Sequence, residues 1–254
     1  MDVRELDRET AATWIERWDR QQERYIADRE ERFQVVGDVV EHVCRSVAEP
    51  VVVDLGCGPG SLTTRLSARI PTARVVGVDT DPFLLGLART TGPERVEYVR
   101  GDLGVPGWSE SLGTGGAWDA AVSTTALHWL DPDRLATVYA DVAAALRPGG
   151  VLVNGDHLYD EQPALRDLAA AVRDRRAERA GVTAHEDWGS WWTAARADPE
   201  LARAFTPADL AAEGSGRGNQ LSRRQHVDVL RQAGFREVGV VWQSGDDHVL
   251  VAVR

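Results

Sequence analysis

One run of residues, Val51-Val52-Val53-Asp54-Leu55-Gly56-Cys57-Gly58-Pro59-Gly60, constrains the fold of this chain more than any other. Three β-branched residues lead into an acid and then into glycines at alternate positions, which predicts a buried parallel strand that ends in a tight turn. The next residues are typical of a helix start, and Ser61 is expected to cap that helix. A strand, a glycine turn and a helix form the nucleotide-binding unit of a doubly wound α/β fold.

Strands and helices alternate up to about residue 155. The expected helices are 8–48, 62–69, 82–90 and 131–146, and the expected strands are 51–55, 73–79, 96–99, 118–123 and 151–154. This alternation predicts a parallel sheet with helices on both faces. A charged, alanine-rich helix at 163–180 and a Trp-rich segment then read as an insertion over the carboxyl edge of the sheet. A last helix at 222–234 precedes two strands, 238–243 and 248–253, whose short connection predicts an antiparallel hairpin.

We therefore expect one domain over residues 1–254. Its parts would be a helical lid at 1–49, a core at 50–155, a helical insertion at 156–220 and the last helix with the strand hairpin at 221–254.

The charge balance argues against some classes of partner. The formal net charge is −11, which disfavours general binding to nucleic acid or to anionic membranes. All 29 basic residues are arginine, so Schiff-base chemistry and the lysine of a P-loop are excluded. With only two cysteines, no apolar leader and no bilayer-length apolar stretch, we expect a cytoplasmic protein.

The acids at the strand ends distinguish between possible ligands. A dinucleotide fingerprint would need a third glycine at position 61, where this chain has Ser61. Asp54 would repel a pyrophosphate but attract a ligand that carries an ammonium and a sulfonium. Asp79 is placed to accept hydrogen bonds from ribose hydroxyls, and Asp102 from an adenine amino group. Simpler interpretations remain: Asp54 as a turn cap, Asp79 as an ordinary strand-end acid and Asp102 as part of a turn.

Four segments, Asp54–Gly60, Val76–Asp79, Gly101-Asp102 and Leu146–Gly150, resemble the successive motifs of class I S-adenosyl-L-methionine (SAM)-dependent methyltransferases. Ser123–Leu130 is similar to the strand-four motif of the trans-aconitate-methyltransferase-like small-molecule group. The resemblance implies a Rossmann-like seven-stranded sheet in the order 3-2-1-4-5-7-6 with strand 7 antiparallel. It also implies SAM as cofactor, S-adenosyl-L-homocysteine (SAH) as product, and a lid and acceptor pocket built from the N-terminal helices and the insertion.

The expected donor site combines residues at the strand ends with two from the lid. They are Asp54, Gly56, Cys57, Gly58, Asp79, Thr80, Asp102, Leu103, Ser123, Tyr25 and Arg29. No chemistry is assigned to the Cys57 thiol. Tyr25 and Arg29 would close over the donor, with Arg29 pairing its carboxylate, or else they are surface residues.

The expected acceptor pocket contains His128, Trp129, His157, Trp188, Trp191 and Trp192. His128 is the candidate base or orienting group, since histidine titrates near neutral pH; alternatively it packs beside Trp129. The tryptophans would suit a flat or apolar acceptor, or would pack the insertion onto the sheet. His157 beside Asp156 suggests a metal pair, but no third ligand is spaced suitably and we expect no metal.

These residues predict SN2 transfer of the sulfonium methyl to an O or N atom of a small-molecule acceptor. The protein would be a monomer or homodimer with no nucleic-acid or membrane partner. Two alternatives stay open: an enzyme that binds SAM without transferring methyl, as a cyclase or with SAM as bystander, and a non-catalytic SAM- or SAH-binding interaction protein. A mass gain of one methylene in a product, or a buried and ordered acceptor pocket, would separate them.

Overall fold

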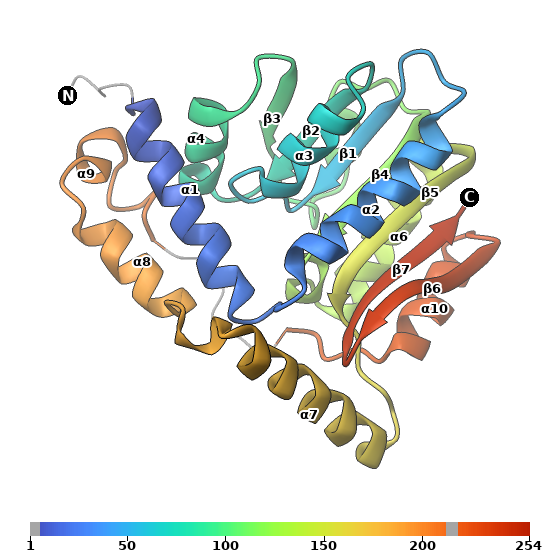
Figure 1. Ribbon diagram of the computed structural model, residues 1–254. Helices are drawn as coiled ribbons and strands as arrows, with labels where there is room; N and C mark the ends of the chain where they lie inside the picture. Colours follow the sequence, from blue (N-terminus) through green and yellow to red (C-terminus); the bar gives the residue numbers. More distant parts are fainter. Residues whose placement is uncertain (1–5, 212–217) are drawn as a thin grey trace.

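A computed structural model describes residues 6–211 and 218–254, and its centre is a seven-stranded sheet (Figure 1). The strand order is β3-β2-β1-β4-β5-β7-β6. The strands are β1 Val51–Leu55, β2 Arg74–Asp79, β3 Val96–Arg100, β4 Trp118–Thr124, β5 Leu146–His157, β6 Glu237–Ser244 and β7 Asp247–Val253. Only β7 is antiparallel to its two neighbours. The predicted strand order and the antiparallel hairpin are confirmed.

Helices cover both faces of the sheet. On one face lie α2 (Arg29–Cys44) and α3 (Ser61–Arg69). On the other lie α5 (Trp108–Ser111), α6 (Pro132–Ala145) and α10 (Arg223–Gln232). The remaining elements are α1 (Arg8–Glu23), α4 (Pro82–Thr91), α7 (Pro163–Ala180), α8 (Trp188–Ala197), α9 (Leu201–Ala204) and the short 3₁₀ turns η1 (Leu127–Trp129) and η2 (Val182–Ala184).

Three local predictions are wrong. The single helix expected over 8–48 is two helices, because α1 packs against α4 and α8 whereas α2 packs against the sheet. Ser61 is not the cap of α3: Gly60 holds that position with φ +83°, and the Ser61 hydroxyl instead donates to Asp19. Strand β5 extends beyond 151–154 on both sides. Part of the insertion expected over 156–220 lies outside the described residues.

Besides the apolar clusters on the two faces of the sheet, a third cluster joins α1 and α8, called the lid below, to α4. Trp191 is fully buried, with its ring centroid 5.0 Å from that of Trp18, 5.5 Å from that of Trp14 and 5.2 Å from that of Trp192. Phe83 of α4 contacts Trp191 and Trp192 from the core side. Figure 1 shows α1 and α8 side by side, so segments far apart in the sequence form one lid.

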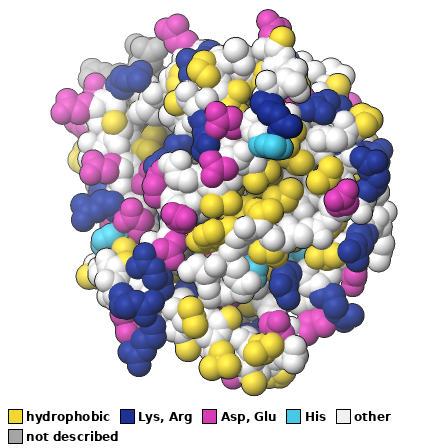
Figure 2. Space-filling model, turned by 45° about the vertical axis from the view of Figure 1, so that its right-hand side comes forward, with side chains coloured by type: hydrophobic (Ala, Val, Ile, Leu, Met, Phe, Trp, Pro, Cys, Tyr) yellow, Lys and Arg dark blue, Asp and Glu magenta, His cyan; other side chains and the backbone are white. Residues whose placement is uncertain are grey.

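Ion pairs tie α2 to α3 on the outer surface. Arg65 pairs with Glu30 at 2.9 Å, and Arg69 pairs with Asp38 and Glu41. On the face in Figure 2, side chains of both charge signs surround a central strip of hydrophobic ones. Among the helices of the described residues, none is long and apolar enough to cross a membrane.

We expect Trp191→Ala to lower the free energy of unfolding by about 3–5 kcal/mol, because it leaves a cavity in the lid cluster. Leu168→Ala is the control, since Leu168 is 62% exposed and its truncation should change stability by less than about 0.5 kcal/mol. Urea denaturation followed by Trp fluorescence and by far-UV circular dichroism measures both. Equal stabilities of the two variants would show that the lid cluster does not contribute to the cooperative fold.

Candidate functional site

The turn after β1 adopts a backbone that favours glycine. Gly56, Gly58 and Gly60 have φ of +69°, +53° and +83°. The N–H groups of Gly56 and Cys57 both donate to the carbonyl of Val78, at 2.8 and 3.0 Å, which fixes the turn to the end of β2. A Cβ on Gly56 would lie 2.3 Å from the Cβ of Ala126. The turns after β1 and β4 therefore touch, and position 56 has no room for a side chain.

Asp54 is a buried acid beneath this turn. Its Oδ2 accepts a hydrogen bond of 2.6 Å from the Thr63 hydroxyl, whereas Oδ1 is buried without a hydrogen-bond partner among the described residues. Burial raises the pKa of Asp54 to about 7, and the nearby charge of Asp79 adds to the rise. An uncompensated carboxylate at a glycine turn fits a ligand that brings positive charge, as the ammonium and sulfonium of SAM would.

Asp79 and Asp102 lie at the next two strand ends. Asp79 accepts the N–H of Gly58 through Oδ2 at 2.8 Å and that of Asp81 through Oδ1 at 2.9 Å. These two backbone bonds fix the position of the carboxylate at the end of β2. Asp102 is exposed, and its Oδ1 accepts the N–H of Gly104 at 2.8 Å. These positions suit the ribose and adenine contacts proposed for the two acids.

Four other residues predicted to contact the donor differ in their solvent exposure. Thr80 is exposed beside Asp79, and Leu103 is buried in the apolar core. The Ser123 hydroxyl is buried and donates to the carbonyl of Leu55 at 2.8 Å, so it joins β4 to β1. Burial raises the pKa of the Cys57 thiol well above its usual value, consistent with packing rather than reactivity.

The lid reaches the glycine turn through residues that sequence reasoning missed. Trp18 lies 3.9 Å from the place of a Cβ on Gly58. Asp19 accepts a 2.6 Å hydrogen bond from the Ser61 hydroxyl and pairs with Arg29 at 2.8 Å. Tyr25 is 42% exposed, and its hydroxyl accepts the N–H of Trp188. Trp14 and Trp18 are four residues apart, which is the spacing of one helix face, but nothing local in the sequence singles out Asp19.

On the acceptor side, His128 forms a pair with Asp156. Its Nδ1 lies 2.8 and 3.0 Å from the two carboxylate oxygens, and the imidazole is 26% exposed whereas Asp156 is buried. Burial alone would lower the pKa of His128, but the charge and hydrogen bond of Asp156 outweigh it and the pKa lies above its usual value. Trp129 is half exposed, with its ring centroid 4.7 Å from that of His128. The pair thus presents a polar, partly accessible imidazole beside an aromatic wall.

The other predicted pocket residues lie elsewhere. Nδ1 of His157 is 3.2 Å from Asp246, which also pairs with Arg173 of α7. Trp191 and Trp192 are buried in the lid cluster, and Trp188 packs partly against it, which favours packing of the insertion onto α1 and α4. Within residues 6–211 and 218–254, no group of three or more His, Cys, Asp or Glu side chains is arranged to hold a metal ion.

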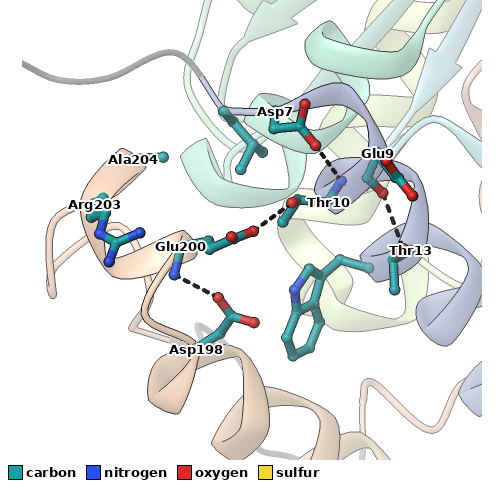
Figure 3. A pocket seen from close by; sticks show the side chains of 10 residues that line it. Asp7, Glu9, Thr10, Thr13, Asp198, Glu200, Arg203 and Ala204 are labelled. Carbon is teal, nitrogen blue, oxygen red and sulfur yellow. Dashed lines mark hydrogen bonds between the residues drawn. The ribbon is translucent and has the colours of Figure 1, made fainter.

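A cavity of about 550 Å³ lies outside this arrangement, between α1 and α9 (Figure 3). Its lining includes Asp7, Glu200 and Asp198, which accept hydrogen bonds from Thr10 N, Thr10 Oγ1 and Glu200 N respectively. None of its lining residues belongs to a strand end. The cavity is therefore distinct from the candidate donor and acceptor sites.

Comparison with known proteins matches residues 52–150 to a methyltransferase domain. A trans-aconitate 2-methyltransferase from Methylobacterium nodulans is 32% identical over 190 residues, which cover 70% of this chain and 68% of that protein. One from Azoarcus sp. is 39% identical over 145 residues, covering 57% and 53% respectively. This chain therefore spans between about half and two thirds of the length of these curated relatives.

Two solved structures are similar in fold. Magnesium protoporphyrin IX methyltransferase from Synechocystis PCC 6803 with bound SAH has a TM-score of 0.57 at 16% identity, covering 95% of this chain and 94% of that one. An O-methyltransferase family protein from Burkholderia thailandensis has a TM-score of 0.56 at 21% identity, covering 92% and 62%. At these identities, the likeness concerns the fold alone.

We expect Asp79→Ala to weaken binding of SAM and SAH about 10- to 100-fold, because two hydrogen bonds to a charged acceptor would be lost. Isothermal titration calorimetry with each ligand measures the effect. Asp133→Ala, at an exposed acid of α6, is the matched control and should bind as the unmodified chain does. Unchanged affinity in Asp79→Ala would rule out its proposed contact with the ribose.

Proposed function

We propose that this chain methylates a small-molecule carboxylate, because it belongs to the class I SAM-dependent methyltransferase family and its acceptor side presents the His128–Asp156 pair. The product would be a methyl ester. When bound, SAM supplies a methyl group on a sulfonium, and its transfer leaves SAH. The relatives named trans-aconitate 2-methyltransferase support a carboxylate acceptor.

The raised pKa of His128 is the reason for proposing a carboxylate as the acceptor. A carboxylic acid is already ionised at neutral pH, so its oxygen needs alignment and desolvation but no base. An alcohol or an ammonium group would need a base, and a histidine whose pKa is raised by Asp156 is poorly suited to that role. Because Asp156 engages Nδ1, Nε2–H is the group left to donate to an anionic acceptor. His128 is therefore proposed as an orienting cation.

The remaining residues would bind the donor and enclose the acceptor site. Asp54, Asp79 and Asp102 would hold the donor over the glycine turn, which Trp18 covers from the lid. Trp129 would form one wall of the acceptor site and exclude water from the imidazole. Arg29 would have to leave Asp19 to pair with the donor's carboxylate, and Tyr25 would have to release the N–H of Trp188 to bond to a donor. These exchanges of partners would couple donor binding to the position of the lid.

The experiment is to incubate the chain with SAM and a panel of small di- and tricarboxylic acids, trans-aconitate among them, and to follow products by mass spectrometry. We expect a gain of one methylene unit and one SAH per product. Amines and phenols in the same panel cover the alternative acceptors. Binding of SAM without any methylated product would overturn the proposal and favour a chain that holds SAM without transferring its methyl group.

We expect His128→Gln to raise KM for the carboxylate about 10- to 100-fold, because a charge-assisted hydrogen bond is lost. Activity of the unmodified enzyme should fall as pH rises through the raised pKa of His128, since only the imidazolium can orient the anion. His42→Gln, an exposed position on α2, is the control. An activity that instead rises through that pKa would identify His128 as a base.

A further inference from the structure

Arg32 is a completely buried arginine that the donor and acceptor sites do not use. It lies in the first turn of α2, and its side chain has no exposed surface. An arginine stays charged in proteins, so burial is tolerated only where other groups compensate the charge. Its Nη1 donates to Asp247 at 2.8 Å and its Nη2 donates to the Thr124 hydroxyl at 2.5 Å.

These contacts span the ends of three neighbouring strands. Thr124 ends β4, Asp247 begins β7, and between them the side chain of Arg32 lies over Gly155 of β5. A Cβ on Gly155 would come within 3.1–3.4 Å of three side-chain atoms of Arg32. Glycine at this position therefore makes room for the arginine.

The strand end that Arg32 holds leads directly into the turn of His128. Thr125 follows Thr124 with φ +52°, a left-handed conformation that is costly for a β-branched residue. Its N–H donates to the carbonyl of Gly155 at 3.0 Å. Such a conformation persists only where the surroundings fix it, and the fixed points are Arg32 on Thr124 and the backbone of β5.

Arg32 also acts on the pair at the end of this turn through its charge. Its charge opposes the rise in the pKa of His128 and contributes to lowering the pKa of Asp156. The other charged or titratable groups facing this pair are His157, whose charge lowers the pKa of Asp156, and His226 of α10, which bonds to Tyr139 at 2.8 Å. Arg32, which belongs to α2 on the face of the sheet opposite to α10, is thus a cation that opposes protonation of His128.

We propose that Arg32 is a positioning residue for the acceptor site: it clamps the carboxyl ends of β4 and β5 to the start of β7 and so holds the turn Thr124–Leu130 that carries His128. The proposal rests on the acceptor role of His128 proposed above. Its electrostatic consequence, however, concerns the imidazole itself and can be measured without any substrate.

The first experiment follows the titration of His128 by NMR, with its signal assigned through His128→Gln. In Arg32→Met the midpoint should move to higher pH, because a nearby positive charge is removed. Arg45→Met, at an exposed position directly after α2, should leave the midpoint unchanged. If Arg32→Met does not fold because Asp247 is left unpaired, Arg32→Met/Asp247→Asn removes both charges and should still give an upward shift, since Arg32 and not Asp247 is the charge that acts on His128.

The second experiment separates position from charge. Thr124→Val keeps the Arg32–Asp247 pair but removes the hydroxyl to which Arg32 donates. It should leave the titration of His128 unchanged and raise KM for the carboxylate about tenfold, with a smaller effect on kcat. A midpoint unchanged in the folded Arg32 variants, or a KM unchanged in Thr124→Val, would overturn the proposal. Absence of turnover in the unmodified enzyme would overturn the proposed function, while the NMR result would still decide the electrostatic effect of Arg32.

Discussion

The contact between Gly56 and Ala126 is the constraint on which both halves of the candidate site depend. Strands β1 and β4 are parallel neighbours, with Val53 opposite Ala121 and Asp54 opposite Val122, so their carboxyl ends open at the same edge. The turn after β1 is the proposed donor side and the turn after β4 is the proposed acceptor side. Because the two turns meet with no room for a Cβ at position 56, a change in either would displace the other. The backbone itself would thereby align a donor and an acceptor bound at the two proposed sites.

The site concentrates buried charge, and the degree of compensation differs from residue to residue. Arg32 has Asp247 and Thr124, and His128 has Asp156. Asp54 has only the Thr63 hydroxyl for one of its two oxygens. Among the described residues, Arg32 and His128 each have a carboxylate partner, although Arg32 Nε has no hydrogen-bond partner, whereas Asp54 has a neutral hydroxyl and one unpartnered oxygen. Asp54 is therefore the group that a cationic ligand would stabilise. This difference in pairing distinguishes the proposed role of Asp54 in binding the donor from the proposed role of Arg32 in holding the strand ends.

The sequence predicted those parts of the fold that depend on local pattern. The glycine turn, the alternation of strands with helices and the final hairpin all follow from periodicity and turn residues, and the family resemblance supplied the strand order. The break at Arg24–Asp28 was missed because both flanking segments have helical periodicity, and only their different packing partners separate them. The pairing of His128 with Asp156 follows from the register, since Thr124 lies opposite Gly155, and that register is invisible in a single sequence. Arg32 gave no signal, because one arginine in a charged helix looks like any other.

An acidic protein can still bind an anionic acceptor, because the net charge acts at long range whereas the acceptor would be held by short-range contacts. A net charge of −11 attracts a donor with an ammonium and a sulfonium through the long-range field. An acceptor carboxylate would be repelled at long range and must be held by short-range contacts. Asp156 raises the pKa of His128 at the proposed acceptor side and so favours the imidazolium, while the charge of Arg32, tied to Asp247, opposes that rise. An imidazolium at His128, paired with Asp156, would orient an anionic acceptor at short range without cancelling the long-range field that attracts the donor. One acidic protein could therefore bind both ligands.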